Sequence, residues 1–472
     1  FERILHSAGQ SYHDLIRLRT NALKDFVDAV VYPGKVAQLQ KLIKWASTKK
    51  IALVPFGGGS SVVGGLEALR GRGQRAVLSV DLTRMDHCLD LDEYSRTATF
   101  EAGIYGPRLE AWLNERGFTL GHFPQSFEYS TLGGWVAARS AGQQSNHYGK
   151  IEELLVALEM ISPKGELKTL RVPAGATGPD INQIVAGSEG LLGIITKSTV
   201  HVHHLPEERR YAAALFPDLQ HCVDFQRELT GSSLDMAMIR VSDPEESRLF
   251  EMLANAGKSG LAHAFKQRLA RQVLKFKNIN SGKCLVMLGM DVEEHTARRQ
   301  DVAVRALVRR YGGFFVGRAA GEKWKQGRFN MPFLRNHLME VSIGIDTLET
   351  ATSYSNVIRL HDAVIAALRS AVPSALVMCH LSHSYHDGAC LYFTIIFNMS
   401  SSDPVAQWRK LKEAANQALM KNGGNMSHHH GIGVDHKSGY QKQNTTANLS
   451  LLRAMKRELD PVGILNPGKL FD

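Results

Sequence analysis

The apolar positions near the N-terminus first repeat with the period of a helix and then form an unbroken run. Between residues 36 and 49 they fall on one helical face: Val36, Leu39, Leu42, Ile43 and Ala46. Residues 51–56 are almost wholly apolar and lead directly into a glycine-rich turn. This order predicts a helix followed by a buried strand, the start of an α/β unit.

Further runs of the same kind predict the remaining elements. In the first half we expect strands over 76–80, 97–101, 154–162 and 194–202, with a helix over 107–115 that stops at Gly117. In the second half we expect strands over 211–216, 236–241, 284–291, 341–348, 376–382 and 390–397, and helices over 293–311, 353–370 and 404–421. A last helix ends at Glu458. Strands joined by long helices beyond Pro206 predict an α+β domain of the ferredoxin-like kind.

The composition is that of a globular protein with room for two domains. The chain has 472 residues, of which 44% are hydrophobic and 22% charged. Its five cysteines are odd in number and widely spaced, so neither a disulfide framework nor a CxxC site is indicated, and a reducing compartment fits best. No run of about 18 apolar residues predicts a transmembrane helix. A targeting segment could precede Phe1, and the C-terminal residues 469–472 do not match a Ser-Lys-Leu peroxisomal signal.

The net charge of +10 leaves three classes of partner open: nucleic acid, an anionic membrane surface and an anionic substrate. The charges are scattered, which gives little support to nucleic-acid binding. The densest region, residues 266–277, mixes basic and apolar side chains. It fits an amphipathic helix on a lipid surface, but a solvated helix that packs one apolar face is favoured.

Three glycine-rich stretches carry the first chemical signal: residues 55–61, 124–134 and 187–195. Glycine lets successive backbone N–H groups turn toward one anionic ligand without a Cβ in the way. Neither the GxGxxG spacing of a Rossmann fingerprint nor the GK[ST] of a P-loop is present, which disfavours a nicotinamide or nucleoside triphosphate ligand. Together and in this order, the three stretches resemble the FAD-binding domain of the vanillyl-alcohol oxidase family.

That resemblance implies FAD and the residues that hold it. They are Pro55, Phe56, Gly57, Gly58, Gly59, Ser60, Ser61, Gln125, Ser126, Ser130, Thr131, Ala138, Arg139, Ser140, Glu189, Gly190, Leu191, Leu192, Gly193, Ile194 and Ile195. Members of the family often bond the flavin to a histidine of the first turn. Because that turn has Ser60 and Ser61 and no histidine here, the resemblance implies non-covalent FAD.

Two later motifs bear on whether this chain is a metal-dependent enzyme that acts on 2-hydroxy acids. Most relatives that process 2-hydroxy acids carry Gly-His-x-Gly-Asp-Gly-Asn-x-His and a later Glu-His-Gly, which hold a divalent metal. Here Tyr392 replaces the last histidine of the first motif and His429 the glutamate of the second. No metal is therefore expected. Histidine is a common zinc ligand, so a site built from His380, His383, His429 and His430 remains the alternative.

Those departures resemble the alkyl-dihydroxyacetone-phosphate synthase family. Its motifs appear as residues 388–393 (Gly-Ala-Cys-Leu-Tyr-Phe), 427–431 (Ser-His-His-His-Gly), 130–135, 148–152, 177–181 and 239–240, and the chain departs from it at 333–336 and 464–469. The resemblance implies exchange of the acyl group of acyl-dihydroxyacetone phosphate for a long-chain fatty alcohol, which forms an ether with no net redox change. The alternative is an FAD-dependent 2-hydroxy-acid oxidase or dehydrogenase.

The same resemblance assigns roles at the site. Tyr392 would be the base, on the expectation that nearby imidazoles shift its pKa from about 10 toward neutrality; the alternative is an ordinary core aromatic. His428, His429 and His430 would bind the phosphate or the leaving carboxylate or relay protons, unless they form a surface turn. Arg335 would clamp an oxyanion, unless it is merely solvated. Arg240 is expected to be a structural link between two domains.

The implied architecture is α+β: a two-part FAD-binding domain of the vanillyl-alcohol oxidase type plus a ferredoxin-like cap domain. We place the FAD-binding domain at residues 1–205, the cap at 206–424 and a C-terminal segment with the histidines, returning to the FAD domain, at 425–472. Expected partners are the two substrates, a membrane surface contacted peripherally and a second copy of the chain, but no nucleic acid. The expected location is cytoplasmic and membrane-associated in a bacterium, or peroxisomal in a eukaryote.

Overall fold

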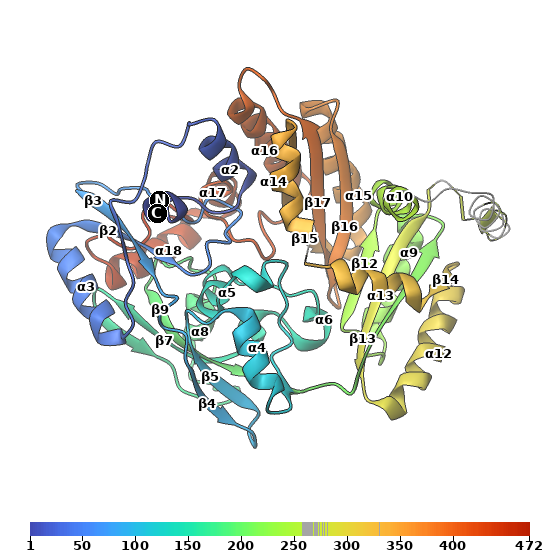
Figure 1. Ribbon diagram of the computed structural model, residues 1–472, viewed down its shortest axis with the longest axis horizontal. Helices are drawn as coiled ribbons and strands as arrows, with labels where there is room; N and C mark the ends of the chain where they lie inside the picture. The colour runs from blue at the N-terminus through green and yellow to red at the C-terminus, as the bar shows by residue number, and fades with distance from the viewer. Residues whose placement is uncertain are drawn as a thin grey trace.

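The structure is a computed structural model that describes residues 1–256, 268, 272, 274–275, 277, 279–280, 282–329 and 331–472. The basic stretch 266–277, for which a lipid-facing helix was considered, lies outside the described residues apart from five isolated positions. Two halves are visible, one built on small N-terminal sheets and one on a large sheet (Figure 1).

The first half begins as the hydrophobic pattern predicts. Helix α3 (Val36–Lys49) leads into β2 (Ile51–Phe56), and β2 joins β1 (Ala29–Val31) and β3 (Ala76–Asp81) in a parallel sheet of order β1-β3-β2. The buried face of α3 packs on this sheet, where Leu39 and Ile43 share a core with Leu53 and Leu465. The apolar face predicted for α3 is therefore the face that packs against the sheet.

A second, antiparallel sheet completes this half in the order β4-β5-β9-β7-β8. Its strands are β4 (Cys88–Asp92), β5 (Thr97–Glu101), β7 (Leu155–Ser162), β8 (Gly165–Lys168) and β9 (Ile194–His201). Around them lie α4 (Gly106–Asn114), α5 (Leu132–Ala138), α6 (Ser145–Tyr148), α7 (Ile151–Leu154) and α8 (Ile181–Val185), and β6 (Phe118–Thr119) pairs with β10 (His203–His204).

The second half is a seven-stranded antiparallel sheet of order β14-β11-β13-β12-β16-β17-β15. Its strands are β11 (Glu208–Phe216), β12 (Met238–Ser242), β13 (Cys284–Val292), β14 (Phe314–Gly317), β15 (Ile343–Ser353), β16 (Leu376–Ser384) and β17 (Gly388–Asn398). Its helices are α9 (Leu219–Gly231), α10 (Pro244–Asn255), α12 (Glu294–Arg310), α13 (Arg318–Gly327), α14 (Met331–Glu340), α15 (Val357–Ala371) and α16 (Pro404–Lys421). The α+β prediction is confirmed, although α9, α10, α13, α14 and β14 were not anticipated.

Segments near both ends of the chain connect the two halves. Beyond α17 (Lys437–Gln443) and α18 (Thr446–Leu459), the C-terminal residues return to the first half, where Leu465 bridges to Leu53 of β2. At the other end, α2 (Tyr12–Arg19) packs on the second half, with the His13 ring stacked on Trp408 of α16 at 3.9 Å. The domain limits at residues 205 and 424 stay a prediction. Within the described part of the chain, none of the helices has both the length and the apolar character needed to span a membrane.

Candidate functional site

The three glycine-rich stretches meet in space. A Cβ on Gly57 would lie 2.3 Å from Thr131 Oγ1, and one on Gly190 would lie 2.8 Å from the Pro55 ring. A Cβ on Gly58 would come within 1.6 Å of the Tyr129 carbonyl oxygen. These glycines are therefore required by the close approach of one loop to another. At Gly58, the protein's own backbone occupies the position that a Cβ would take.

The first loop fits the pyrophosphate of a dinucleotide. None of the described residues accepts a hydrogen bond from the backbone N–H groups of residues 57–61, and all five residues are partly exposed. Gly59 has a φ of +70°, which turns the chain sharply at the middle of the loop. A row of partly exposed donors without protein acceptors suits an anionic group.

Several side chains predicted to hold the cofactor are instead bonded within the protein. Gln125 donates to the Arg328 carbonyl oxygen at 2.7 Å, and Arg139 donates to Gln183 at 2.7 Å. The Ser130 hydroxyl accepts from the Trp135 indole at 2.7 Å. Leu191, Leu192, Ile194 and Ile195 are core residues. These side chains shape the loops, and direct contact of the predicted residues with the cofactor stays a prediction.

A buried carboxylate that the sequence analysis missed, Glu349, organises the histidine loop of residues 427–431. It lies on β15 opposite Tyr392 of β17, and its side chain is 1% exposed. Its oxygens accept hydrogen bonds from the Ser427 hydroxyl at 2.7 Å and from the backbone N–H groups of His429 at 3.1 Å and His430 at 2.9 Å. The N–H of His428 also donates to it. Burial alone would raise the pKa of Glu349, but the imidazoles and these donors outweigh it and lower the pKa to about 2.

A second carboxylate holds the following turn from the opposite side. Glu189, in the third glycine-rich loop, accepts from the backbone N–H groups of Ile432 at 2.6 Å and Gly433 at 2.8 Å. Glu349 of the large sheet thus holds the histidine loop, and Glu189 of the first half holds the turn that directly follows it. Because Glu189 belongs to a predicted cofactor loop, this contact places the histidines next to it.

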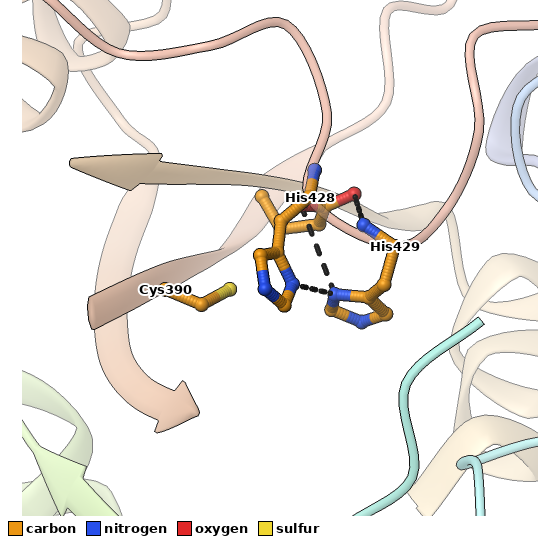
Figure 2. A group of neighbouring side chains, drawn as sticks. Cys390, His428 and His429 are labelled. Carbon is orange, nitrogen blue, oxygen red and sulfur yellow. Dashed lines mark hydrogen bonds and ion pairs between the residues drawn. The ribbon is translucent and has the colours of Figure 1, made fainter. Parts of the chain in front are cut away.

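The imidazoles of the loop contact one another and their surroundings. His428 Nδ1 lies 2.9 Å from His429 Nδ1, and His428 Nε2 lies 2.5 Å from the Tyr385 hydroxyl. Figure 2 shows the two rings and the Cys390 thiol turned toward the same space. Burial lowers the pKa of His428, His429 and His430, and it lowers that of the neighbouring His383 to about 3. These imidazoles are therefore neutral at physiological pH and can accept protons.

Tyr392 lies among these rings, stacked on His380 at 4.7 Å and edge-on to His430 at 5.4 Å. Burial raises the pKa of Tyr392, and a hydrogen bond with Thr347 and the charge of Arg335 only partly oppose this effect. The expectation that imidazoles shift this pKa toward neutrality is wrong. Neutral rings supply no charge to stabilise a phenolate, so the phenol keeps its proton.

The two arginines differ in their relation to this cluster. Arg335 donates to the Gln10 carbonyl oxygen at 2.6 Å, and its positive charge lowers the pKa of both Tyr392 and His430, so it lies near them. Arg240 instead donates to Glu246 at 2.8 Å and lies 3.0 Å from His380 Nδ1. Arg240, Glu246 and His380 all belong to the second half, and the expected role of Arg240 as a link between domains stays a prediction.

A possible metal group exists here, with members other than those considered from the sequence. Single ligand atoms of Glu349, Cys390, His428 and His429 lie within 4.8 Å of one another. However, both Glu349 oxygens already accept hydrogen bonds. Burial raises the pKa of the Cys390 thiol well above its ordinary value, so the thiolate that a metal needs is disfavoured. The expectation that no metal binds here stays a prediction.

Comparison with known proteins agrees with this arrangement. A family described as "FAD binding domain" matches residues 27–171, and one described as "FAD linked oxidases, C-terminal domain" matches residues 205–470. The chain is 33% identical to an alkyldihydroxyacetonephosphate synthase from Dictyostelium discoideum, over 99% of this chain and 77% of that one. It is 32% identical to the synthase of the same name from Trypanosoma brucei brucei, over 100% and 77%.

A solved structure gives the same result. An alkyldihydroxyacetonephosphate synthase structure superposes with a TM-score of 0.83 at 31% identity, covering 99% of this chain and 82% of that one. The likeness thus extends over both halves and includes the FAD-binding domain. The chain belongs to the alkyldihydroxyacetonephosphate synthase family of flavoenzymes, and its cofactor is FAD.

Proposed function

We propose that this enzyme exchanges the acyl group of acyl-dihydroxyacetone phosphate for a long-chain fatty alcohol. The C1–O bond to the acyl group breaks, the fatty acid leaves as a carboxylate, and the alcohol oxygen forms the new ether bond to C1. The observation that carries this proposal is the position of Tyr392 beside His429 and His430. Tyr392 and His429 stand where the hydroxy-acid relatives have metal ligands, and they are suited to moving protons.

Bound FAD would supply nucleophilic chemistry that splits the displacement at C1 into two easier steps. The backbone N–H groups of residues 57–61 would hold its pyrophosphate. The histidine loop, joined through the turn that follows it to Glu189 of a cofactor loop, would face the reacting end of the substrate.

The protonation states of Tyr392 and the histidines indicate which of them can accept a proton and which can donate one. Because burial raises the pKa of Tyr392 and lowers those of His429 and His430, the phenol starts protonated and the imidazoles start neutral. An imidazole is therefore the group able to accept the first proton from the substrate or the alcohol, and Tyr392 is the group able to donate one. We therefore propose Tyr392 as a proton donor, in place of the base expected from the sequence.

A cation must balance the phosphate or the departing carboxylate. We propose Arg335 for this position, since its charge already acts on Tyr392 and His430 and a guanidinium can bind an oxyanion through two N–H groups.

The proposal is tested with FAD-loaded enzyme, acyl-dihydroxyacetone phosphate and a long-chain alcohol. We expect mass spectrometry to find the ether and the free fatty acid in equal amounts, with no reduction of an electron-accepting dye. Dye reduction by a 2-hydroxy acid, without ether formation, would favour the dehydrogenase alternative instead.

We also propose peripheral contact with a membrane surface, because both substrates and the product carry long hydrocarbon chains. Met252 and Leu253 of α10 are 63% and 54% exposed and are followed in the chain by the basic stretch 266–277. Flotation with anionic lipid vesicles, lost when both side chains become serine, would support this contact. The cellular location and a second copy as partner stay predictions, and size measurement by light scattering tests the latter.

A further inference from the structure

A second group of possible ligand atoms lies outside the histidine loop. It consists of His13 from α2, Glu67 from the chain beyond the first glycine-rich loop, and Asp435 from the turn before α17. His13 Nδ1 lies 3.4 Å from Asp435 Oδ1 and 3.9 Å from Glu67 Oε1. Three segments that are distant in sequence thus bring one nitrogen and two carboxylate oxygens together.

Asp435 makes this group unusual. Its side chain is 1% exposed, yet neither carboxylate oxygen forms a hydrogen bond with any described residue. His13 Nδ1 faces Asp435 and has no hydrogen-bond partner in the described chain either. A buried carboxylate without a donor costs several kcal/mol in general, so such a group indicates a missing partner. Glu349, whose oxygens are fully engaged, shows the opposite case in the same molecule.

The neighbouring arginine partners two carboxylates but not Asp435. Arg17 pairs with Asp14 at 3.0 Å and with Glu67 at 2.6 Å, but it does not bond Asp435. Asp14 is also buried. Among the described residues, the Arg17 guanidinium thus pairs with two of the three buried carboxylates, and a cation near Asp435 would partner the third.

We propose that His13, Glu67 and Asp435 bind a divalent cation. Ligands at about 2.0–2.2 Å around a tetrahedral ion are separated by roughly 3.3–3.6 Å. The His13–Asp435 distance of 3.4 Å fits this range, and Glu67, 3.9 Å from His13, would have to move slightly closer. One imidazole and two carboxylates suit Zn²⁺ or Mn²⁺ better than a thiol-seeking metal.

The position of the site defines its role. His13 stacks on Trp408 of the large sheet's helix α16, Glu67 follows the FAD loop, and Asp435 follows the histidine loop. The backbone N–H of Asp435 also donates to Val63 O at 3.2 Å. A cation here would connect α2, the FAD loop and the histidine loop and so hold the two halves together. It would take no part in the chemistry at C1.

The test uses the full-length, FAD-loaded protein after treatment with a chelator, titrated separately with Zn²⁺ and Mn²⁺ by calorimetry. We expect one equivalent of at least one of the two ions to bind and to raise the melting temperature. His13→Gln and Asp435→Asn should each weaken this binding by about 10-fold or more and abolish the rise in melting temperature. Cys390→Ser, which alters the other possible metal group, should leave that equivalent in place.

Two results would overturn the site: neither ion binds, or the bound equivalent survives both His13→Gln and Asp435→Asn but disappears in Cys390→Ser. Should Asp435→Asn fail to fold, His13→Gln decides the question, because it keeps all three carboxylates. The parent enzyme should turn over equally well with and without chelator at a temperature well below its melting point, since the site lies outside the reaction.

Discussion

Replacing Glu349 with glutamine tests whether this one carboxylate holds the histidine loop. The substitution keeps the shape of the side chain but removes its charge and turns one acceptor oxygen into a donor NH₂. The amide orientation that loses the fewest hydrogen bonds puts the NH₂ in place of the oxygen that accepts from the His428 N–H. The bonds from Ser427, His429 and His430 then remain. One bond to a charged group is then lost, at about 1.5–3 kcal/mol, and three others fall to the strength of neutral bonds, at roughly 1 kcal/mol each. The lost bond and the weakening of the three others by roughly 1 kcal/mol each give an expected total loss of about 5 kcal/mol.

Urea unfolding of the FAD-loaded protein measures this loss directly. Glu340→Gln, at the exposed end of α14, is the matched control and should change stability by no more than about 0.5 kcal/mol. Ether formation should be measured at a temperature where both variants are folded, and it should fall in Glu349→Gln while bound FAD is retained. A loss below about 1 kcal/mol together with unchanged turnover would refute the assignment of Glu349 as the anchor of the loop.

Three further predictions concern the phenol, the FAD loop and the buried histidines. Tyr392→Phe should lower ether formation by roughly 10²-fold and change stability by no more than about 1 kcal/mol; near-normal turnover would contradict its role as proton donor. Gly58→Val should give colourless protein, because the added Cβ would overlap the Tyr129 carbonyl oxygen, whereas a normal flavin spectrum would show that the loops can separate. Burial lowers the pKa of His122 and His383 to about 3 and that of His436 to about 4, so below the ordinary value of about 6.5 the unfolded chain binds protons that the folded chain does not. These three histidines should therefore lower stability by roughly 4 kcal/mol between about pH 7.5 and 5.5, about 1.4 kcal/mol each, and urea unfolding that shows constant or rising stability over that range would contradict these assignments.

The sequence predicted best those elements whose pattern and packing coincide. Helix α3 and strand β2 were found within a residue, because their apolar positions pack on one core. Helices α9 and α10 were missed although both have buried faces. Their N-caps, Asp218 and Asp243, were available as signals in the sequence.

The candidate site was predicted through its histidines and Tyr392 but without the carboxylate that arranges them. Glu349 lies about 80 residues before the loop it holds, and nothing in the local sequence distinguishes it from an exposed glutamate of an edge strand. The direction in which the pKa of Tyr392 shifts was predicted wrongly for a related reason. Burial of the phenol and of its imidazole neighbours depends on packing between strands, which sequence spacing does not reveal.

The most direct test of the central claim follows the alcohol oxygen. FAD-loaded enzyme is incubated with acyl-dihydroxyacetone phosphate and a long-chain alcohol labelled with ¹⁸O, and the masses of the products are measured by mass spectrometry. The account predicts that the ether carries the label and that the released fatty acid does not. Label in an ester of the fatty acid with the alcohol, or the absence of any labelled ether, would contradict it.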